Sequence, residues 1–167
     1  MRPGALVVFV FALATIAARD RAAADASDPE RRGSPAGTGS EAERTAVATT
    51  VQLYFQGHAT GSGEFFGKAM HPEGKMLWVK DGALAQKTFP DYIAGAPGKP
   101  ADDEARRSRR ILMIDVTGDA AVAKLELAYP DATLIDYMSL LRLDGKWVVI
   151  NKIFHRGAPR PAVPSHR

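Results

Sequence analysis

Residues 110–154 read RILMIDVTGDAAVAKLELAYPDATLIDYMSLLRLDGKWVVINKIF. Apolar residues dominate this stretch, and turn-forming residues interrupt it at TGD (residues 117–119) and again at DG (residues 144–145). Asp-Gly between two apolar runs is a strong signal for a tight β-hairpin. The stretch therefore predicts an antiparallel meander of strands at the C-terminal end of the folded region.

A long amphipathic helix is expected over residues 41–58, which contain no proline and a single glycine, Gly57. Ser40 is the predicted N-cap, and Glu43 completes the pattern of a capping box. Helical spacing brings one set of side chains onto a single stripe, which we expect to be buried. That stripe consists of Val47, Val51, Tyr54, Phe55 and His58.

Shorter elements are expected between this helix and the meander. Proline stops a helix, so a second helix would end at His71-Pro72. The expected elements are this helix over residues 62–70, strands over residues 75–80 and 83–87 joined by an Asp81-Gly82 turn, and a third helix, capped by Thr88 and Asp91, that ends near Ala94. Their order predicts an α+β fold, in which three N-terminal helices pack on a curved mixed or antiparallel sheet and form a cone with a central pocket.

The start of the chain is typical of a signal peptide, expected over residues 1–24. Arg2 supplies positive charge, residues 5–18 form an almost unbroken apolar run, and AAA at residues 22–24 suits cleavage. The run is shorter than the about 20 apolar residues that a membrane span needs. We therefore expect a periplasmic or secreted protein with no stable membrane span after cleavage, and an uncleaved N-terminal anchor is the alternative. The chain has no cysteine, which excludes disulfides.

Two segments flank the expected domain, which covers residues 41–155. Residues 25–40 are rich in Ser, Pro, Gly and charge, and residues 156–167 are basic and rich in proline. Such segments bury too little apolar surface to offset their ordering entropy. We expect a disordered linker before the domain and a disordered tail after it.

The charge of the chain argues against a nucleic-acid partner. The whole chain has a net charge of +3, but removal of the expected signal peptide takes away three arginines and one aspartate and leaves 19 basic and 18 acidic residues. Nucleic-acid binding favours a basic face on the domain itself, whereas this mature protein would be close to neutral. The arginines of residues 106–110 follow acidic residues and are expected to be solvated, with an anion site as the alternative.

The last hairpin predicts which side chains share a face of the sheet. A two-residue turn at Asp144-Gly145 fixes the parity of both strands. The expected cross-strand pairs on one face are Arg142–Trp147, Leu140–Val149, Met138–Asn151 and Asp136–Ile153. Neither face is clearly polar, and a sheet that is apolar on both sides must be covered on both sides. Three helices suffice for one side, so we expect a homodimer through the other, with a different exported protein as the alternative cover.

Four motifs follow one another along the domain: YFQGHATG (residues 54–61), MHP (70–72), DVTGDAA (115–121), and a segment from Asp136-Tyr137 through DGKW (144–147) to Asn151-Lys152. In content and order they resemble the nuclear transport factor 2-like superfamily, and within it the group named putative lumazine-binding. The resemblance covers nearly all of residues 41–154 and implies the cystatin-like α+β cone. Relatives include ketosteroid isomerases, scytalone dehydratase, polyketide cyclases and non-catalytic binding domains, so the resemblance implies a fold more strongly than a function.

Two side chains are candidates for acid–base catalysis. Asp136 is a carboxylate on an otherwise apolar strand face, and burial raises the pKa of a carboxyl group toward values that suit a general base. His71 lies where members of the resembled superfamily often point a side chain into the cavity. The alternatives are a solvated or salt-bridged Asp136 and a His71 satisfied by backbone carbonyls or solvent.

Six side chains are candidates for ligand contact in the expected pocket: Tyr54, His71, Trp78, Met138, Trp147 and Asn151. Tyrosine and asparagine offer hydrogen bonds, and the tryptophans offer flat surfaces for a planar ligand. Each could instead be an ordinary core or rim residue. His58 could also reach the pocket, but a histidine at a helix C-terminus is explained by the helix dipole.

Several kinds of site lack their residues in this sequence. Cysteine is absent and the four histidines do not have the spacing of metal ligands, so no metal site is expected. Neither a glycine-rich phosphate loop after a strand nor a Gly-x-Ser-x-Gly motif occurs. We accordingly expect no cofactor.

Two functions remain. The first is an exported domain of the nuclear transport factor 2-like type that binds a small planar or apolar ligand without catalysis, which the lack of a clear acid–base pair favours. The alternative is a cofactor-free lyase or isomerase of the ketosteroid isomerase or polyketide cyclase type. In it, Asp136 or His71 would move a proton beside a carbonyl, and Tyr54 would stabilise the oxyanion. This alternative requires Asp136 and His71 to face one cavity.

Overall fold

The computed structural model describes residues 39–159. The expected signal peptide lies outside the described residues, as do most of the expected linker and tail. Both ends of the domain extend slightly beyond the predicted limits: the Gly39 N–H donates to the Val116 carbonyl oxygen at 2.7 Å, and the last strand continues to Gly157. No helix within residues 39–159 is long and apolar enough to cross a membrane.

Three α-helices and six strands make up the described part of the chain. The helices are α1 (Glu41–Thr60), α2 (Gly63–Ala69) and α3 (Phe89–Ala94), and a short 3-10 helix, η2, covers Glu104–Arg106. The strands are β1 (Met70–Lys80), β2 (Ala83–Thr88), β3 (Ser108–Thr117), β4 (Ala120–Tyr129), β5 (Ala132–Leu143) and β6 (Lys146–Gly157). This is the predicted α+β fold, and its main departure from prediction is that β1 begins at Met70 instead of Lys75.

The early start of β1 places a proline inside a strand. As predicted, α2 stops before Pro72, and its last residue is Ala69. The chain then continues directly as a strand, and the register of β1 against β6 shifts between Met70 and Lys75. Proline has no N–H to donate to a ladder, so this irregular part of β1 is where it can be accommodated.

The start of α1 is tied to the last hairpin of the sheet. The Ser40 side chain accepts a hydrogen bond from the Glu43 N–H at 3.2 Å, which confirms the predicted N-cap. The Glu43 carboxylate, expected to complete a capping box, instead accepts hydrogen bonds from Arg142 at 2.7 Å and from Trp147 Nε1 at 2.9 Å. Gly61 ends the helix with a left-handed φ of 67°, a conformation that glycine adopts without steric cost.

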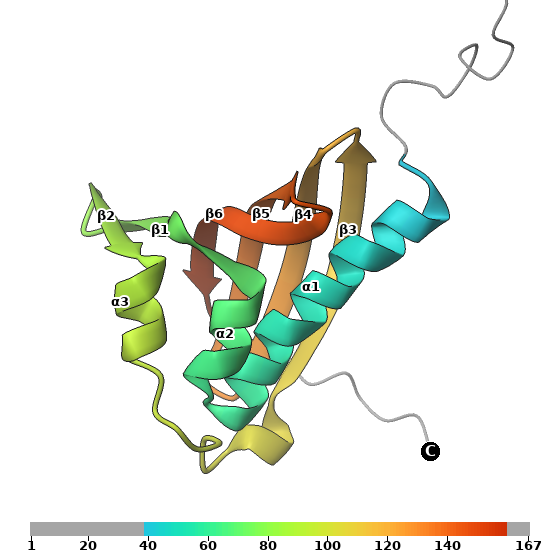
Figure 1. Cartoon of the computed structure of the whole chain (residues 1–167). Helices are drawn as coiled ribbons and strands as arrows, with labels where there is room; N and C mark the ends of the chain where they lie inside the picture. The colour runs from blue at the N-terminus through green and yellow to red at the C-terminus, as the bar shows by residue number, and fades with distance from the viewer. Residues whose placement is uncertain (1–38, 160–167) are drawn as a thin grey trace, which may run out of the picture. The chain divides into compact units, whose positions relative to one another are not determined.

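The strands form one six-stranded mixed sheet in the order β2-β1-β6-β5-β4-β3. β3 to β6 form the predicted antiparallel meander, and β1 joins it by parallel pairing with β6. Figure 1 shows α1, α2 and α3 on one side of this sheet, with the long α1 crossing in front of the strands. The face that the helices cover is referred to below as the inner face, and the opposite one as the outer face.

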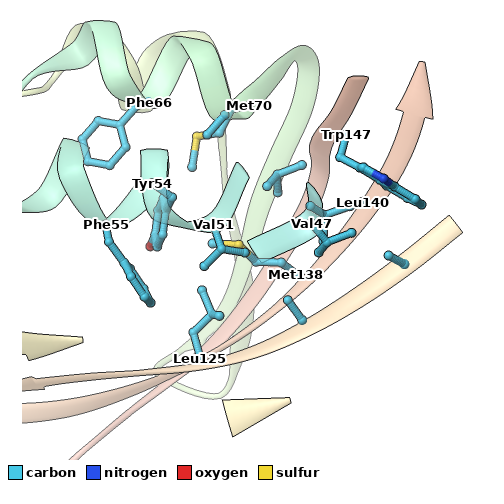
Figure 2. Packing of buried hydrophobic residues seen from close by; sticks show 14 of the residues in the cluster. Val47, Val51, Tyr54, Phe55, Phe66, Met70, Leu125, Met138, Leu140 and Trp147 are labelled. Atoms are coloured by element: carbon cyan, nitrogen blue, oxygen red, sulfur yellow. The ribbon is translucent and has the colours of Figure 1, made fainter. Parts of the chain in front are cut away.

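The core lies between α1 and the inner face. Three residues of the predicted stripe, Val47, Val51 and Tyr54, are fully buried. Figure 2 shows them beside the buried side chains of Leu125 and Met138 from the sheet. Burial of such apolar surface contributes about 25 cal/mol per Å² and is the main stabilising term of the fold. The apolar core extends to the ring of Tyr54, so the polar groups around its hydroxyl lie in a surrounding of low dielectric.

The register of the β5–β6 hairpin follows the prediction only near the turn. The first predicted pairs are present: Arg142–Trp147 and Leu140–Val149. The register then shifts between Ser139 and Leu140, because β6 carries one residue more than β5, Ile150, at this point. A bulge of this kind exchanges the faces to which all following side chains of the strand point.

The bulge corrects the predicted position of Asn151. Met138 pairs with Lys152 and not with Asn151, and Asp136 pairs with Phe154. The prediction that Asn151 shares a face with Asp136 is therefore wrong. Asn151 pairs with Ser139 on the outer face, and Lys152 takes the inner position.

The outer face carries apolar side chains that solvent reaches. The exposed fractions of Val122, Tyr137 and Ile153 are 44%, 45% and 52%. Tyr137 and Ile153 form a cross-strand pair and line an apolar groove of about 300 Å³ together with Trp78 and Phe154. The expectation that the second face is not clearly polar is confirmed, whereas the expected dimer through it stays a prediction.

Candidate functional site

Three polar side chains meet in the interior of the domain: Tyr54 from α1, Asp136 from β5 and Lys152 from β6. The Tyr54 hydroxyl donates a hydrogen bond to Asp136 Oδ2 at 2.7 Å. Lys152 Nζ donates to the Tyr54 hydroxyl oxygen at 3.0 Å and to the same Oδ2 at 3.2 Å. These three residues are referred to below as the interior cluster. Their exposed fractions are 0%, 0% and 3%, so the cluster is closed to solvent.

Local structure explains how each member reaches this position. Tyr54 follows Val47 and Val51 at helical spacing, which directs it to the inner face with the core stripe. Asp136 lies two residues from Met138 on β5 and therefore shares its inner face. Lys152 reaches the inner face only because the bulge in β6 reverses the parity of that strand.

The charges of the interior cluster are paired with each other and with aromatic rings. A buried ion pair is tolerated when further hydrogen bonds and favourable contacts offset its desolvation. Lys152 Nζ lies over the rings of Phe154, Tyr54 and Tyr92, at 4.7, 5.4 and 5.8 Å from their centroids. The negative faces of aromatic rings attract a cation, so these rings form an aromatic cage around the ammonium group.

One acceptor of the interior cluster has no partner. Asp136 Oδ1 is buried and has no hydrogen-bond partner within residues 39–159. An unsatisfied buried acceptor costs on the order of 1–3 kcal/mol, and more when it is charged. Native structures rarely keep such a group without a reason, and a bound water or ligand is one such reason.

His58 connects the interior cluster to two further tyrosines. Its Nε2 lies 3.2 Å from the Tyr92 hydroxyl, and its Nδ1 lies 3.3 Å from the Tyr129 hydroxyl. The imidazole also contacts the Tyr54 ring edge-on, with 4.6 Å between the ring centroids. A neutral imidazole has one N–H, so one tyrosine donates to the ring and the other accepts from it.

Burial sets the protonation states of this network. Burial, followed by the charges of nearby cations, Lys152 first among them, lowers the pKa of His58 well below its usual value. Burial, followed by the negative charge of Asp136, raises the pKa of Tyr54 well above its usual value. Burial lowers the pKa of Lys152, although Asp136 opposes this effect. At neutral pH His58 is therefore uncharged, and Tyr54 keeps the proton that it donates to Asp136.

A pocket of about 300 Å³ opens beside the network. His58 and Tyr92 line it, and both also contact the interior cluster. Three cationic side chains, Lys87, Lys99 and Arg107, lie along its wall. This pocket is referred to below as the mouth pocket. A molecule in it would touch His58 and Tyr92, which in turn contact Tyr54 and Lys152 of the interior cluster.

The residues of the network can hold a ligand and move a proton. Asp136 Oδ1 can accept a hydrogen bond from a ligand donor, and Tyr54 and Lys152 can transfer protons to and from Oδ2 along hydrogen bonds already in place. No group of three or more His, Cys, Asp or Glu side chains within residues 39–159 could hold a metal ion.

Comparisons with known proteins place this chain in a family. The family model described as "Putative lumazine-binding" matches residues 42–155, which is most of the chain. The chain belongs to the putative lumazine-binding family. The resemblance seen in the sequence motifs is thereby confirmed.

Solved structures agree with the fold of this family. An NTF2-like protein of unknown function from Shewanella baltica has a TM-score of 0.64 and 22% identity, over 75% of this chain and 99% of that one. An NTF2-like protein of unknown function from Methylobacillus flagellatus has a TM-score of 0.62 and 27% identity, over 72% and 96%. A ketosteroid isomerase-like protein from Erwinia carotovora atroseptica has a TM-score of 0.57 and 10% identity, over 72% and 100%. Among curated proteins, Aldolase FrzH of Cladobotryum sp is 22% identical over 113 residues, 68% of this chain and 90% of that protein.

Three of the predicted site residues come together in the structure. Tyr54 and Asp136 are hydrogen-bonded to each other, and Met138 pairs with Lys152 across the strands. Each of these three side chains is at most 1% exposed. Their roles in catalysis or ligand binding stay predictions.

The other predicted residues lie elsewhere in the fold. Trp147 donates to Glu43 at the start of α1. Trp78 packs against Phe154 with 5.5 Å between ring centroids. His71 lies in β1, where its Nδ1 accepts a hydrogen bond from the Glu73 N–H at 3.3 Å. Asn151, as described, is on the outer face, so the structure brings none of these four residues into the interior cluster.

Sequence reasoning did not single out Lys152 or Tyr92, and it set His58 aside as a helix-end cation. A lysine in the middle of the apolar run VVINKIF was the available signal for Lys152, since lysine is almost never fully buried unless it is paired. No comparable signal marks Tyr92, because its contacts depend on how α3 packs against α1.

Proposed function

We propose that this protein is an exported domain that binds a small molecule through the mouth pocket and the interior cluster beneath it. The observation that carries the proposal is Asp136 Oδ1, a buried carboxylate oxygen without a partner. It lies in a network whose outer members, His58 and Tyr92, line an open pocket. A ligand that extends from the pocket past His58 and Tyr92 and offers an N–H or O–H donor would satisfy this oxygen.

The lining residues describe the ligand. Aromatic side chains from α1, α2 and α3 line the pocket, namely those of His58, Phe66 and Tyr92. Flat rings favour a planar molecule, and a few polar groups fix its orientation. A small planar heterocycle with ring N–H donors meets both requirements, in agreement with the description of the family. Binding without catalysis is the simplest function for such a site.

Fluorescence titration with lumazine tests the ligand site. The test uses the full-chain protein and a variant, Ala101→Trp, that fills the mouth pocket at a lining residue. Ala105→Trp adds the same bulk to η2 at an exposed position and serves as the matched control.

We expect wild type and Ala105→Trp to bind lumazine with the same affinity, and Ala101→Trp to lose at least about tenfold, equivalent to about 1.4 kcal/mol. Equal affinity of all three proteins would place lumazine outside the mouth pocket. Native mass spectrometry of protein purified from its source, without refolding, would then identify a different ligand. The protein releases this ligand on denaturation, and its mass can be measured.

A second candidate function is proton transfer beside a carbonyl group. Asp136 is on the inner face, fully buried, and hydrogen-bonded to Tyr54 and Lys152, so a base and two acids lie together. One curated relative is named as an aldolase, and one similar structure as ketosteroid isomerase-like. The expectation that His71 faces the same cavity as Asp136 is wrong, because His71 lies in β1 and accepts from the Glu73 N–H. In this version Tyr54 supplies the acid instead.

Deuterium exchange tests this second function. Cyclohexanone in D₂O, followed by NMR, would lose its α-protons faster with wild type than with Asp136→Asn, and His71→Ala would match wild type. An exchange rate that does not depend on Asp136 would leave binding as the function.

Export and dimerisation complete the proposal. The apolar run and small residues near the start of the sequence support export, and the exposed apolar side chains of the outer face support a homodimer. Fractionation of source cells tests export: the chain should appear outside the cytoplasm with a mass that lacks residues 1–24. A full-length chain that stays in the cytoplasm would overturn this part of the proposal.

A further inference from the structure

We propose that Lys152 is a nucleophilic amine, which condenses with the carbonyl group of an aldehyde or ketone in the interior of the domain to form an iminium. The inference rests on the proposed use of the mouth pocket by a small molecule. It adds a covalent step and assigns a role to Lys152 that neither a binding site nor proton transfer by Asp136 requires.

The surroundings of Lys152 contain the groups that such a condensation needs. Nζ is 3.2 Å from Asp136 Oδ2 and 3.0 Å from the Tyr54 hydroxyl oxygen. A carboxylate at this distance can take the ammonium proton, and a phenol can donate to the carbonyl oxygen as negative charge develops on it. Burial lowers the pKa of Lys152, which increases the fraction of neutral amine.

The reaction balances with these groups alone. Asp136 Oδ2 takes a proton from the Lys152 ammonium, and the free amine attacks the carbonyl carbon, so that a C–N bond forms and the carbonyl π pair moves to oxygen. That oxygen is protonated from Asp136 or Tyr54, and the nitrogen loses a second proton to the same groups. A further proton transfer to the hydroxyl breaks the C–O bond, water leaves, and an iminium remains. The net change is ammonium plus carbonyl to iminium plus water.

The aromatic cage fits the product as well as the starting amine. The ammonium and the iminium carry the same single positive charge at the same nitrogen. Asp136 at 3.2 Å and the rings of Phe154, Tyr54 and Tyr92 at 4.7 to 5.8 Å therefore stabilise both states. The net reaction therefore leaves the charge of the apolar interior unchanged, where the burial of an additional unpaired charge would be costly.

Tyr92 contacts both the mouth pocket and Lys152. Its ring lines the pocket, and its centroid is 5.8 Å from Lys152 Nζ. Tyr92 belongs to α3, a helix of only six residues. A carbonyl compound that approaches Nζ from the pocket past Tyr92 needs this ring to move, and removal of the ring should open that path.

Reductive trapping tests the proposal on the full-chain protein. Acetaldehyde and sodium cyanoborohydride convert an iminium into a stable ethylated lysine, and peptide mass spectrometry locates each ethyl group. Lys80, an exposed residue at the end of β1, is the internal reference. We expect ethylation of Lys152 to be at least about tenfold faster than that of Lys80.

A second variant tests the proposal in case the Tyr92 ring of the wild-type protein moves aside only slowly. Tyr92→Ala, checked for folding by circular dichroism, should accelerate ethylation of Lys152 and leave that of Lys80 unchanged. Preferential labelling of Lys152 in either protein supports the proposal, and preferential labelling in neither overturns it. Because lumazine titration reports on the mouth pocket without covalent chemistry, failure of the trapping would leave the proposed binding function intact.

Discussion

Lys152 and Asp136 show how strongly a single buried ion pair affects the free energy of unfolding. Both side chains are almost completely buried, and each is the main source of opposite charge for the other. Removal of one partner leaves an uncompensated buried charge, which costs about 3–5 kcal/mol. Removal of both charges leaves an ordinary core site.

The single variant Lys152→Met should therefore be less stable than wild type by about 3–5 kcal/mol. The double variant Asp136→Asn/Lys152→Met should recover most of that loss, because the amide oxygen introduced at position 136 still accepts from Tyr54. Urea unfolding followed by circular dichroism measures both. Equal stability of the single and double variants would show that the two charges are not coupled in the folded protein.

The lowered pKa of His58 predicts that the stability of the protein depends on pH. Burial, and after it the nearby positive charges, lowers the pKa of this imidazole in the folded protein, whereas in the unfolded chain it is about 6.5. Below about pH 6.5 the unfolded state binds a proton that the folded state does not. Stability present above that pH should be lost as the pH falls toward the folded-state pKa, by up to about 1.4 kcal/mol per pH unit.

Comparison of wild type with His58→Gln measures this contribution. Urea unfolding between pH 7.5 and about 5.5, a window set by the free histidine pKa, should show a steeper loss for wild type than for the variant. His155→Gln, which changes an exposed histidine of β6, should keep the wild-type slope. A variant at position 58 that keeps the full slope would assign the pH dependence to other groups.

Among elements, the contact between α1 and α2 depends on the absence of a side chain at Gly57. A Cβ at this position would lie 2.5 Å from a carbon of the Phe66 ring. Glycine within a helix normally costs about 0.5–1 kcal/mol relative to alanine, but here it allows the two helices to approach. Gly67 of α2 has no atom within 4 Å of the corresponding point.

Two alanine substitutions should thus have opposite effects on the stability of the protein. Gly57→Ala should destabilise the protein by about 1–3 kcal/mol through overpacking against Phe66. Gly67→Ala should stabilise it by up to about 1 kcal/mol through helix propensity alone. Thermal unfolding by differential scanning calorimetry compares them. A stabilising effect of Gly57→Ala would mean that Phe66 moves away at little cost.

The β5–β6 hairpin shows where local sequence is a sufficient guide to an element and where it is not. The Asp-Gly turn and the pairs next to it were predicted correctly, because turn chemistry fixes register over the first residues. The bulge at Ile150 has no residue that marks it, since glycine is absent there and Val149 and Ile150 both favour a regular strand. The β6 residues assigned beyond it, Asn151 and Ile153, were therefore placed on the wrong face.

For the whole molecule, the uncovered outer face predicts association. Tyr137 and Ile153 are about half exposed, and an apolar groove runs beside them. Contiguous exposed apolar surface of this kind is typical of interaction sites. A two-fold homodimer would cover the same patch on both copies.

Size-exclusion chromatography with light scattering should give twice the chain mass for wild type at micromolar concentration. Ile153→Lys should give a monomer, because it places a charge in the centre of the patch. Gln52→Lys adds the same charge at an exposed position of α1 and should leave the dimer unchanged. A monomeric wild type would shift the expectation to a different protein as the partner of this face.

Local sequence was enough to establish the helices, the N-cap of α1 and the meander, because each depends on residues close together in the chain. Ser40 caps α1, and Asp144-Gly145 forms the turn between β5 and β6. Each affects only residues a few positions away in the chain. The site was decided by tertiary structure. Tyr54 and Lys152 are 98 positions apart, and they meet only because a bulge turns β6 and α1 crosses the inner face. Such a contact depends on register and packing over the whole sheet, and no short pattern of residues encodes it.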